Sequence, residues 1–468
     1  MRPSAPALDL ERVRALLPRY ETAGPRYTSY PTAPVWNERY GVDDFRAELG
    51  RRDVSPDEPL SLYAHVPFCA SLCHFCACNR VITRKAELPS RWLETVEREI
   101  AAVREALAVP RTATQQHWGG GTPTHLEPAQ IRRLFSALVD AFPMRPDAEI
   151  SIEVDPRVTT PEHVETLREL GFRRISLGVQ DFDPRVQAAI HRQQPVAMTA
   201  ALVERARRAG FASVNVDLIY GLPFQSEESF DRTLDEVLAL APDRVAVYGY
   251  AHVTWVAKQQ RGFERHDLPA AATRLAVFLR AIGRFLEAGY VHVGMDHFAR
   301  PEDDLAKALH DGTLRRNFMG YTTQAGVDLL GFGPSAISEL RASYAQNERE
   351  LEAWDAAVRS RGLATRRGHR LGADDLERRW IIGRIMCHGA LAAADYRAAF
   401  GHEWASAHAD ELARLGPLLE DGLVEQDADG SLRLLPLGRL LVRNVAMLFD
   451  AYLPEQQRAG RPLFSRTV

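Results

Sequence analysis

The stretch of sequence that decides the fold is residues 61–79, which read SLYAHVPFCASLCHFCACN. Residues 62–66 form a short apolar run of the length expected for a buried strand. Four cysteines follow this run within ten positions, whereas the fifth, Cys387, stands alone. So few cysteines, clustered so tightly, indicate metal or redox chemistry rather than a disulfide framework.

The spacing of the cluster, C-x3-C-x2-C-x-C, narrows that chemistry. Structural zinc sites usually pair two distant C-x2-C knuckles or add late histidines, but here all the thiols lie in one loop. Three thiolates on one loop can hold three irons of a cubane and leave the fourth iron open for a substrate or cofactor. Cys78 is then spare. In the zinc alternative, His65 and His74 would be candidate ligands, although histidine at such positions is more often a core or surface residue.

Outward from the cluster, strand-like runs alternate with helical patterns, which predicts parallel βα units with right-handed crossovers. At least six such strands suggest a complete or partial barrel, with its sites at the carboxyl ends of the strands. The further strands are expected at 116–118, 149–154, 174–179, 213–220 and 244–250. Helices are expected at 90–107 (N-cap Ser90), 161–170 (N-cap Thr159 or Thr160), 198–209 and 227–240.

One junction recurs between the predicted helices and strands. Leu170-Gly171-Phe172, Ala209-Gly210-Phe211 and Ala288-Gly289-Tyr290 each place a glycine before an aromatic residue. Such a glycine can end a helix in the left-handed conformation while the aromatic ring packs back on the last turn. The irregular spacing of the three copies indicates repeated αβ units rather than a solenoid.

Polar and glycine residues at the strand ends predict a pocket. Residues 119–123, GGGTP, follow the second strand, where glycine lets the backbone approach a ligand closely. Glu153, Gln180 and Asp217 end three successive apolar runs. On one barrel rim, these side chains would line a common site.

Both ends of the chain depart from this alternation. Residues 1–55 are rich in proline and irregular, and residues 374–422 and 437–452 carry helical patterns on either side of a hairpin signal at 427–430. That order resembles a winged helix, but paired basic residues are too few to favour DNA binding. We therefore expect an N-terminal arm (1–55), an α/β barrel (56–360) and a mostly helical C-terminal domain (361–468).

Composition sets further limits. The 468 residues carry 58 Lys and Arg against 62 Asp and Glu, a net charge of −4, which argues against a dedicated nucleic-acid binder. Hydrophobic residues make up 46%, as in ordinary globular proteins. No stretch reaches 18 uncharged apolar residues, and charged side chains interrupt the first 20 positions. We expect a protein of the cytoplasm with no membrane partner.

The motif C-x3-C-x2-C directly after the first strand of a βα barrel is typical of radical S-adenosylmethionine (SAM) enzymes. Within that superfamily the sequence resembles the oxygen-independent coproporphyrinogen III oxidases, also called coproporphyrinogen dehydrogenases. The stretches that carry the resemblance are 26–33 (RYTSYPTA), 61–79, 117–124 (HWGGGTPT), 151–157 (SIEVDPR), 178–182 (GVQDF), 216–223 (VDLIYGLP), 294–301 (GMDHFARP) and 320–324 (GYTTQ).

The resemblance implies roles for individual residues. It implies that Cys69, Cys73 and Cys76 ligate a [4Fe–4S] cluster, with Cys78 nearby, and that Tyr63 and His65 belong to the catalytic set. It also implies two SAM molecules. The positions matching the first SAM site are Tyr63, Gly120, Glu153 and Ile337. Those matching the second are Phe75, Gly121, Thr122, Gln180, Arg192, Asp217 and Ala251.

The implied reaction is the oxidative decarboxylation of two propionates of coproporphyrinogen III to vinyl groups, giving protoporphyrinogen IX in heme biosynthesis. An electron from the cluster would cleave SAM, and the 5′-deoxyadenosyl radical would take a hydrogen from the propionate β-carbon. The implied partners are this substrate, an electron donor of flavodoxin or ferredoxin type and an unidentified acceptor. A monomer is expected. Candidates for holding the substrate carboxylates are Arg26, Arg300, Arg315 and Arg316.

Two departures and two alternatives accompany this interpretation. Met319 stands where glutamine is expected, and Thr254 where proline is expected, so a polar contact at Met319 is in doubt. The first alternative is a radical SAM-type heme chaperone, although such proteins typically have phenylalanine at the position of Cys78 and lack the RYTSYPTA arm. The second is a zinc-binding structural or regulatory protein with a winged helix.

Overall fold

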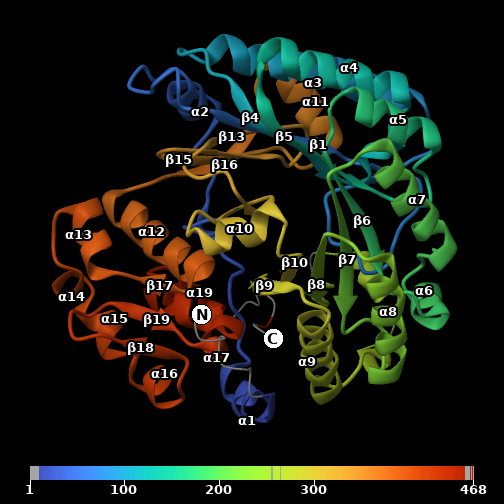
Figure 1. Ribbon diagram of the computed structural model, residues 1–468. Helices are drawn as coiled ribbons and strands as arrows, with labels where there is room; N and C mark the ends of the chain where they lie inside the picture. Colours follow the sequence, from blue (N-terminus) through green and yellow to red (C-terminus); the bar gives the residue numbers. More distant parts are fainter. Residues whose placement is uncertain (1–9, 255–256, 264, 459–463, 465, 467–468) are drawn as a thin grey trace. The chain divides into compact units, whose positions relative to one another are not determined.

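The chain folds into two compact units, and the computed structural model describes residues 10–254, 257–263, 265–458, 464 and 466 (Figure 1). The sheet unit comprises residues 36–284 and 326–370, and the helical unit the described parts of 1–35, 285–325 and 371–468. Residues 1–9 of the predicted arm, and 459–463, 465, 467 and 468 of the predicted C-terminal domain, lie outside the described residues. The three-part division at residues 55 and 360 stays a prediction.

A parallel sheet forms the core of the sheet unit, which confirms the predicted α/β class. Its parallel strands, in spatial order, are β13 (Asp328–Phe332), β1 (Leu60–Val66), β4 (Ala113–Gly120), β5 (Met144–Val154), β6 (Arg174–Gln180), β7 (Ser213–Tyr220) and β8 (Arg244–Gly249). Every strand run expected from the sequence is present. The order is linear within this unit, so the sheet is a partial barrel.

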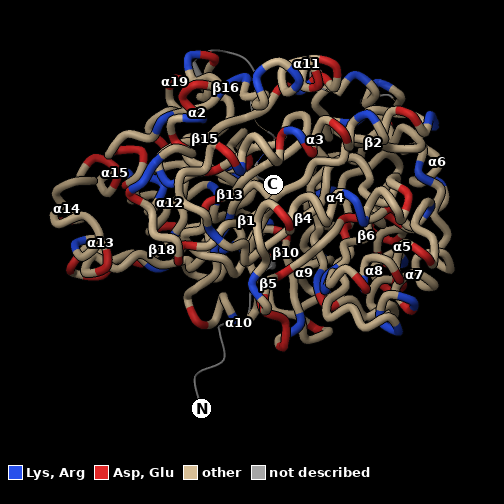
Figure 2. The backbone as a smooth tube through the Cα atoms, turned by 90° about the horizontal axis from the view of Figure 1, so that it is seen from above, with Lys and Arg blue, Asp and Glu red and all other residues tan. Residues whose placement is uncertain are grey.

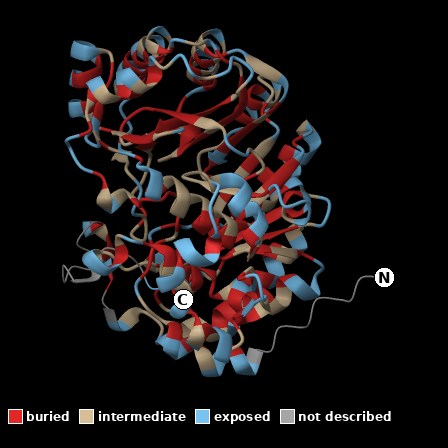
Figure 3. Cartoon of the chain, turned by 90° about the vertical axis from the view of Figure 1, so that its left-hand side faces the viewer, coloured by how far each residue is buried: buried red, intermediate tan, exposed pale blue. Residues whose placement is uncertain are grey.

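Helices cover the outer face of this sheet, and neighbouring ones pack side by side in chain order (Figure 1). The strands are mostly buried, whereas the helices expose their outward faces (Figure 3). The helices assigned here are α2 (Val42–Leu49), α3 (Glu87–Ala106), α4 (Pro128–Ala141), α5 (Pro161–Glu169), α6 (Pro184–Ala189), α7 (Val196–Ala209), α8 (Glu227–Leu240), α9 (Ala271–Glu287, which runs on into the helical unit) and α11 (Leu351–Arg361). Short elements are β2 (Phe68–Cys69), β3 (Val81–Ile82), η2 (Pro123–His125), η3 (Lys258–Gly262) and η4 (Arg265–Asp267).

The edge of the sheet from β13 onward was not anticipated, including β13 itself, which pairs parallel with β1. Three antiparallel strands extend the sheet there: β14 (Ile337–Leu340), β15 (Ser343–Asn347) and β16 (Thr365–Arg370). They are short and partly polar, so their apolar periodicity is weak, and antiparallel edge strands follow no helical crossover that would reveal them.

The three glycine–aromatic junctions act as predicted. Gly171, Gly210 and Gly289 have φ angles of 91°, 89° and 83°, and the following aromatic residue is buried in each case. The amide of that aromatic residue donates to the carbonyl five residues earlier, for example Phe172 N–H to Leu167 O at 3.0 Å. This is the Schellman arrangement that ends a helix and directs the chain into the next strand.

The structure shows where the two capped helices predicted at 90–107 and 161–170 begin. Thr160 caps α5, since its side chain accepts from the amide of His163 at 3.3 Å. Ser90 as the N-cap of the long helix is wrong: α3 begins at Glu87, and the Ser90 hydroxyl donates to the Ala86 carbonyl inside the first turn. The turn before Pro89 already adopts helical geometry, because proline fits the first turn of a helix without a lost hydrogen bond.

The helical unit is built mainly from short helices, as predicted for residues 374–422. Its elements are α1 (Leu10–Tyr20), η1 (Ala33–Val35), β9 (Val291–Gly294), β10 (His297–Ala299), α10 (Asp304–His310), β11 (Arg315–Asn317), β12 (Gly320–Thr322), α12 (Ala373–His388), β17 (Ala390–Leu391), α13 (Ala393–Phe400), α14 (Trp404–Ala407), α15 (Ala409–Ala413), α16 (Gly416–Glu420), β18 (Val424–Gln426), β19 (Leu432–Leu434), α17 (Pro436–Leu440), α18 (Val442–Ala446), η5 (Met447–Phe449) and α19 (Leu453–Arg458). The predicted hairpin is β18–β19, and β17 pairs with β19 to complete a three-stranded sheet.

Part of the supposedly irregular N-terminus is ordered within the helical unit. The expectation of an irregular segment is wrong for α1, whose Val13, Leu17 and Tyr20 are buried at helical spacing. In the RYTSYPTA segment, the Tyr27 hydroxyl donates to Asp450 at 3.0 Å and the Tyr30 hydroxyl accepts from the Ala451 amide at 3.0 Å.

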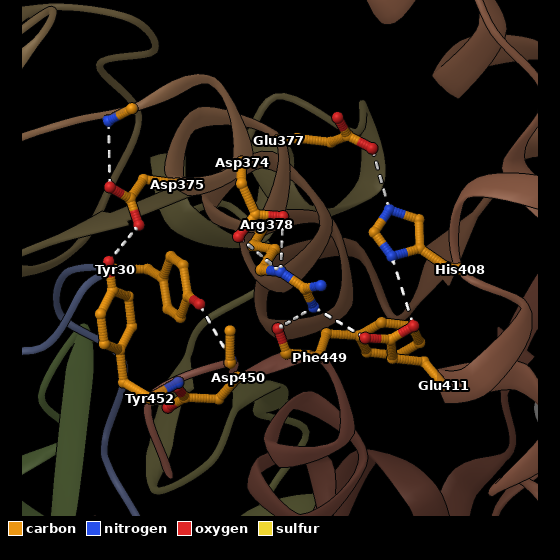
Figure 4. Close-up of polar contacts among 12 residues, drawn as sticks. Tyr30, Asp374, Asp375, Glu377, Arg378, His408, Glu411, Phe449, Asp450 and Tyr452 are labelled. Carbon is orange, nitrogen blue, oxygen red and sulfur yellow. Dashed lines mark hydrogen bonds and ion pairs between the residues drawn. The ribbon is translucent and has the colours of Figure 1, made fainter. Parts of the chain in front are cut away.

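A polar network stabilises the same region from the C-terminal side (Figure 4). Arg378 donates to Asp374, to Glu411 and to the carbonyl of Phe449. The buried His408 ring lies between Glu377 and Glu411, with distances of 3.0 Å and 3.7 Å to their carboxylate oxygens. These contacts join residues up to 71 positions apart within one unit.

Charge is spread evenly over both units. Acidic and basic segments alternate along the backbone without a block of one sign (Figure 2). In the described residues, no helix is both long and apolar enough to cross a lipid bilayer.

Candidate active site

The cysteine loop begins where β1 ends, at the carboxyl edge of the parallel sheet. All five cysteines are free thiols. Backbone contacts fix the loop against the end of α6: the His74 amide donates to Ile190 O at 2.9 Å, and the His191 ring bonds to Leu72 O at 2.8 Å. The thiols of Cys69, Cys73 and Cys76 are thus presented from one short, anchored segment.

The glycine turn after β4 packs directly on this loop. The Gly121 amide donates to Val66 O and the Thr122 amide to Phe68 O, both at 2.8 Å. A Cβ atom on Gly121 would lie 2.7 Å from the Pro67 and Phe68 carbonyl oxygens, so the approach requires glycine. The Thr122 hydroxyl lies 3.5 Å from the Cys69 sulfur. The glycine run is therefore a close-packed partner of the cysteine loop rather than a simple turn.

Glu153, at the end of β5, faces the same glycine turn. Its carboxylate accepts from the Gly120 amide at 3.3 Å and lies 3.5 Å from His117 Nε2. Burial disfavours its charge, but the contacts from His117 and Gly120 outweigh burial and hold the pKa of Glu153 below its ordinary value. An ionised carboxylate at this position suits a cationic amine, which would donate to its oxygens.

Tyr63 and His65 lie side by side on β1. The Tyr63 hydroxyl lies 3.1 Å from His65 Nδ1, and His65 Nε2 lies 2.9 Å from the Asn79 carbonyl. Burial lowers the pKa of His65, so the ring is neutral, with Nε2–H donating to Asn79 and Nδ1 accepting from Tyr63. Both ring nitrogens are engaged, which leaves this histidine with no lone pair for the zinc alternative.

Two guanidinium groups surround the Cys73 sulfur. Arg157 Nη2 lies 3.4 Å from it and Arg192 Nη1 3.7 Å. Asp155 binds both arginines, at 2.6 Å and 3.0 Å. Burial works against the charge of Asp155, yet Arg192 and Arg157 together hold its pKa below the ordinary value.

Gln180 and Asp217 lie at the ends of β6 and β7, as expected. Gln180 adopts a left-handed φ of 71°, which is uncommon outside glycine and frequent at functional sites. Asp217 accepts from Asn215 at 2.9 Å and Ser176 at 3.3 Å, while burial and the neighbouring Glu153 raise its pKa to about 7. This carboxyl is therefore poised to change charge near neutral pH.

One residue that the sequence did not single out connects two predicted ones. The Gln260 side chain is buried, and its amide donates to Phe75 O at 2.8 Å and Ala251 O at 3.1 Å. It thereby ties the cysteine loop to the segment after β8. A lone glutamine in a polar stretch carries no sequence signal, so only the fold reveals it.

Ile337, the remaining predicted residue, begins β14 beside the end of β13. A Cβ atom on Gly331 would lie 2.4 Å from the Ile337 carbonyl, so this backbone approach also requires glycine. Gly331 is the direct parallel neighbour of Tyr63 on β1. The structure thus places Glu153, Gln180 and Asp217 at or near the ends of neighbouring strands, whereas Phe75, Arg192 and Ala251 lie in loops.

The donor set fits an iron–sulfur cluster. In the described part of the chain, no three His, Cys, Asp or Glu side chains converge to hold a single metal ion. A cubane binds each thiolate through its own iron, so its ligands need not converge on one point. Positive groups at Cys73 and a hydroxyl at Cys69 are the outer-shell partners that thiolate ligands of such clusters use.

The candidate arginines for the substrate lie in the helical unit. Arg26 pairs with the buried Asp296, and Arg316 Nε donates to the Arg26 carbonyl at 3.3 Å while its guanidinium covers the Tyr321 ring. Arg315 contacts His388 at 2.7 Å. Arg300 lies over the Tyr290 ring. The Met319 backbone amide donates to Asn317 Oδ1 at 2.9 Å, and its thioether offers only a weak acceptor where glutamine would offer an amide.

Comparison with known proteins supports these features. Residues 63–237 match the family model described as "Radical SAM superfamily". The oxygen-independent coproporphyrinogen III oxidase of Escherichia coli (strain K12) is 45% identical over 454 residues, which is 97% of this chain and 98% of that protein. The enzyme of the same description from Pseudomonas aeruginosa is 44% identical over 455 residues, with the same coverage of 97% and 98%.

A solved structure shows the same architecture. Coproporphyrinogen III oxidase from Escherichia coli, described as a radical SAM enzyme, superposes with a TM-score of 0.88 at 44% identity, covering 91% of this chain and 97% of that one. The agreement extends over both units, so it confirms the fold as a whole rather than the barrel alone.

Proposed function

The chain belongs to the oxygen-independent coproporphyrinogen III oxidase family of the radical SAM superfamily, and on that premise we propose that it converts coproporphyrinogen III to protoporphyrinogen IX by oxidative decarboxylation of two propionates. It is an oxidoreductase of porphyrin and heme biosynthesis, and the family's cofactors are a [4Fe–4S] cluster and SAM. The observation that carries the proposal is the cysteine loop at the end of β1, packed on the glycine turn that ends β4.

In this proposal Cys69, Cys73 and Cys76 would hold the cluster. When bound, the cluster and SAM would supply the radical chemistry that removes hydrogen from the propionate β-carbon. Cys78 is no ligand. Its thiol hydrogen-bonds Cys76, and this contact, against burial, lowers the pKa of Cys76 to about 6.

The protein residues bind and orient. We propose that Glu153 accepts the amino group of the first SAM beside the Gly120 amide, with Tyr63 and Ile337 completing that site. His65 acts on Tyr63, since its Nδ1 accepts the Tyr63 hydroxyl and fixes that ring.

A second SAM is also part of the proposal. Its residues would be Phe75, Gly121, Thr122, Gln180, Arg192, Asp217 and Ala251. Gln260 supports this set because it fixes both Phe75 and Ala251 through their carbonyls. The protonation of Asp217 near neutral pH would make binding at this second position depend on pH.

The partners follow from the chemistry. Each decarboxylation releases carbon dioxide and leaves one electron for an acceptor, while SAM cleavage consumes one electron from a donor of flavodoxin or ferredoxin type. We propose that the protein works as a monomer in the cytoplasm, where thiols stay reduced and available to the cluster.

Anaerobic turnover tests the proposal. Reconstituted protein is incubated with coproporphyrinogen III, SAM and dithionite, and the products are followed as porphyrin after oxidation and as 5′-deoxyadenosine. We expect both products, and none when SAM is omitted. Stable binding and transfer of heme without coproporphyrinogen turnover would instead support the heme chaperone alternative.

A further inference from the structure

Cys73 differs from the other two predicted cluster ligands in its surroundings. Its sulfur lies 3.4 Å from Arg157 Nη2 and 3.7 Å from Arg192 Nη1, whereas among the described residues the Cys69 sulfur hydrogen-bonds only the Thr122 hydroxyl, at 3.5 Å. Arg192 already has a place in the proposed second SAM site. Arg157 has no assigned role, and its side chain is mostly buried, with 16% of its surface exposed.

Local contacts fix the position of Arg157. Asp155 accepts from its Nε at 3.0 Å, from its Nη2 at 2.6 Å and from its backbone amide at 3.0 Å. The guanidinium is therefore held flat on the carboxylate in the bidentate geometry that only arginine offers. The Nη2 atom that donates to Asp155 also donates to the Cys73 sulfur. Asp155 therefore orients the Arg157 guanidinium toward Cys73 without any bound cofactor.

The charges near Cys73 do not cancel. Asp155 contributes one negative charge, while Arg157 and Arg192 contribute two positive charges. These side chains are buried or nearly so, which weakens solvent screening. The excess positive charge is concentrated at one ligand of the proposed cluster.

We propose that Arg157 is a positioning residue for the cluster: it donates to the Cys73 thiolate and raises the reduction potential of the [4Fe–4S] centre. This inference rests on the proposed function. One-electron reduction adds negative charge to the cluster and its sulfurs, and a hydrogen bond from a cation stabilises the reduced form more than the oxidised form. Asp155 acts through Arg157 by fixing the guanidinium.

Arg157 is also a better probe than Arg192. Arg192 Nη2 donates to Gly178 O at 2.6 Å at the end of β6, so its replacement would disturb the strand end and the proposed second SAM site together. Among the described residues Arg157 hydrogen-bonds only Asp155 and Cys73. Its replacement therefore leaves the strand end at Gly178 intact and changes only the charge and hydrogen bonds around Cys73.

The test is a redox titration of the reconstituted holoprotein, followed by electron paramagnetic resonance, without SAM or substrate. We compare wild type, R157Q, R157K and R208Q, since in the part of the chain that the structure describes Arg208 forms only an exposed pair with Glu204. At the wild-type midpoint, R157Q should hold about tenfold less reduced relative to oxidised cluster, equivalent to about 59 mV for one electron. R157K should show about threefold less, and R208Q no change.

Unchanged midpoints in R157Q and R157K, each with wild-type iron content, would overturn the proposal. If R157Q takes up no cluster, R157K alone decides, because it keeps the charge but loses the bidentate grip on Asp155. A wild-type protein that binds no cluster would overturn this inference and the proposed function together. A shifted potential in a protein that fails to turn over coproporphyrinogen III would uphold the inference and reject the substrate.

Discussion

Cysteine occurs in two regions with opposite surroundings. In the loop after β1, the thiols face guanidinium groups, a hydroxyl and another thiol. Cys387, on α12 in the helical unit, is 3% exposed, and burial raises the pKa of its thiol to about 11. Cys387 thus behaves as a small apolar side chain, whereas Cys73 lies beside two guanidinium groups and Cys76 beside a thiol donor, which stabilise a thiolate. Burial raises the pKa of Cys69 to about 11 as well, so the contrast rests on the donors beside the sulfurs and not on burial.

Since all five residues are cysteines, their positions in the fold, rather than their residue type, separate the reactive thiols of the loop from the inert thiol of Cys387. The loop lies at the carboxyl ends of parallel strands, where backbone and side chains meet without forming a closed core. Cys387 is buried on α12, beside a small cavity that His292 and Val293 also line. The following substitutions test this contrast.

The largest effect is expected at Cys73. Cys73→Ser should lose the cluster and reduce turnover by more than about a hundredfold, because replacing outer-shell partners alone commonly costs 10–100-fold. Iron and sulfide content, absorbance near 400 nm and anaerobic turnover measure this. Full turnover in this variant would show that Cys73 is no more essential to activity than the buried Cys387.

Glu153→Gln should produce the next largest effect. The amide keeps the shape of the side chain but removes the charge that His117 and Gly120 stabilise. A charged hydrogen bond contributes about 1.5–3 kcal/mol, so SAM affinity should fall about tenfold or more while the cluster remains. Equilibrium binding of SAM to the reconstituted protein measures it, and unchanged affinity would remove Glu153 from the site.

Glu99, which lies outside the cysteine loop, tests whether burial can raise the pKa of a carboxyl that also accepts hydrogen bonds. Its carboxyl, on α3, accepts from the Gly333 amide and from Asn347, both at 2.7 Å, and burial raises its pKa to about 8. The folded protein therefore keeps a proton that the unfolded chain releases near the ordinary value of 4.5. Stability should accordingly fall as the pH rises from about 5 to 8.

The matched variant is Glu99→Gln, which has no proton to lose. Between pH 6 and pH 8 the wild type should lose about 1–2 kcal/mol relative to this variant, since one unit of pKa difference corresponds to about 1.4 kcal/mol. Thermal unfolding midpoints at the two pH values measure the difference. Parallel pH profiles for the two proteins would show that Glu99 is ionised in the folded state.

The smallest effect is expected at Cys387. Cys387→Ser should leave iron content and turnover within about twofold of wild type and cost about 1 kcal/mol of stability, because a hydroxyl replaces a buried apolar sulfur. The thiol borders a small cavity lined also by Met386 and His292, which can accept the change. Loss of the cluster in this variant would erase the distinction between the two regions.

The sequence predicted the parallel strands β1 and β4–β8 because each has an apolar run followed by a glycine or polar signal, but it missed the parallel strand β13. It missed α1, whose buried stripe of Val13, Leu17 and Tyr20 was masked by prolines at both ends of the segment. It missed β14–β16 because edge strands are short and pair antiparallel.

The residues of the candidate site likewise divide into those that the sequence predicts and those that it does not. Cys69 can be predicted from the cysteine spacing, and Glu153 and Asp217 from their positions at the ends of apolar runs. Gln260 and Arg157 carry no such signal, because their roles depend on contacts with residues 185 and 84 positions away. Long-range contacts of this kind become visible only in the folded chain.

Hydrogen abstraction by the adenosyl radical can be tested by turnover of coproporphyrinogen III deuterated at the propionate β-carbons, with mass analysis of the 5′-deoxyadenosine formed. We expect deuterium in 5′-deoxyadenosine together with vinyl product in the wild type, and neither in Cys73→Ser. Vinyl product accompanied by 5′-deoxyadenosine without deuterium would contradict hydrogen abstraction by the adenosyl radical.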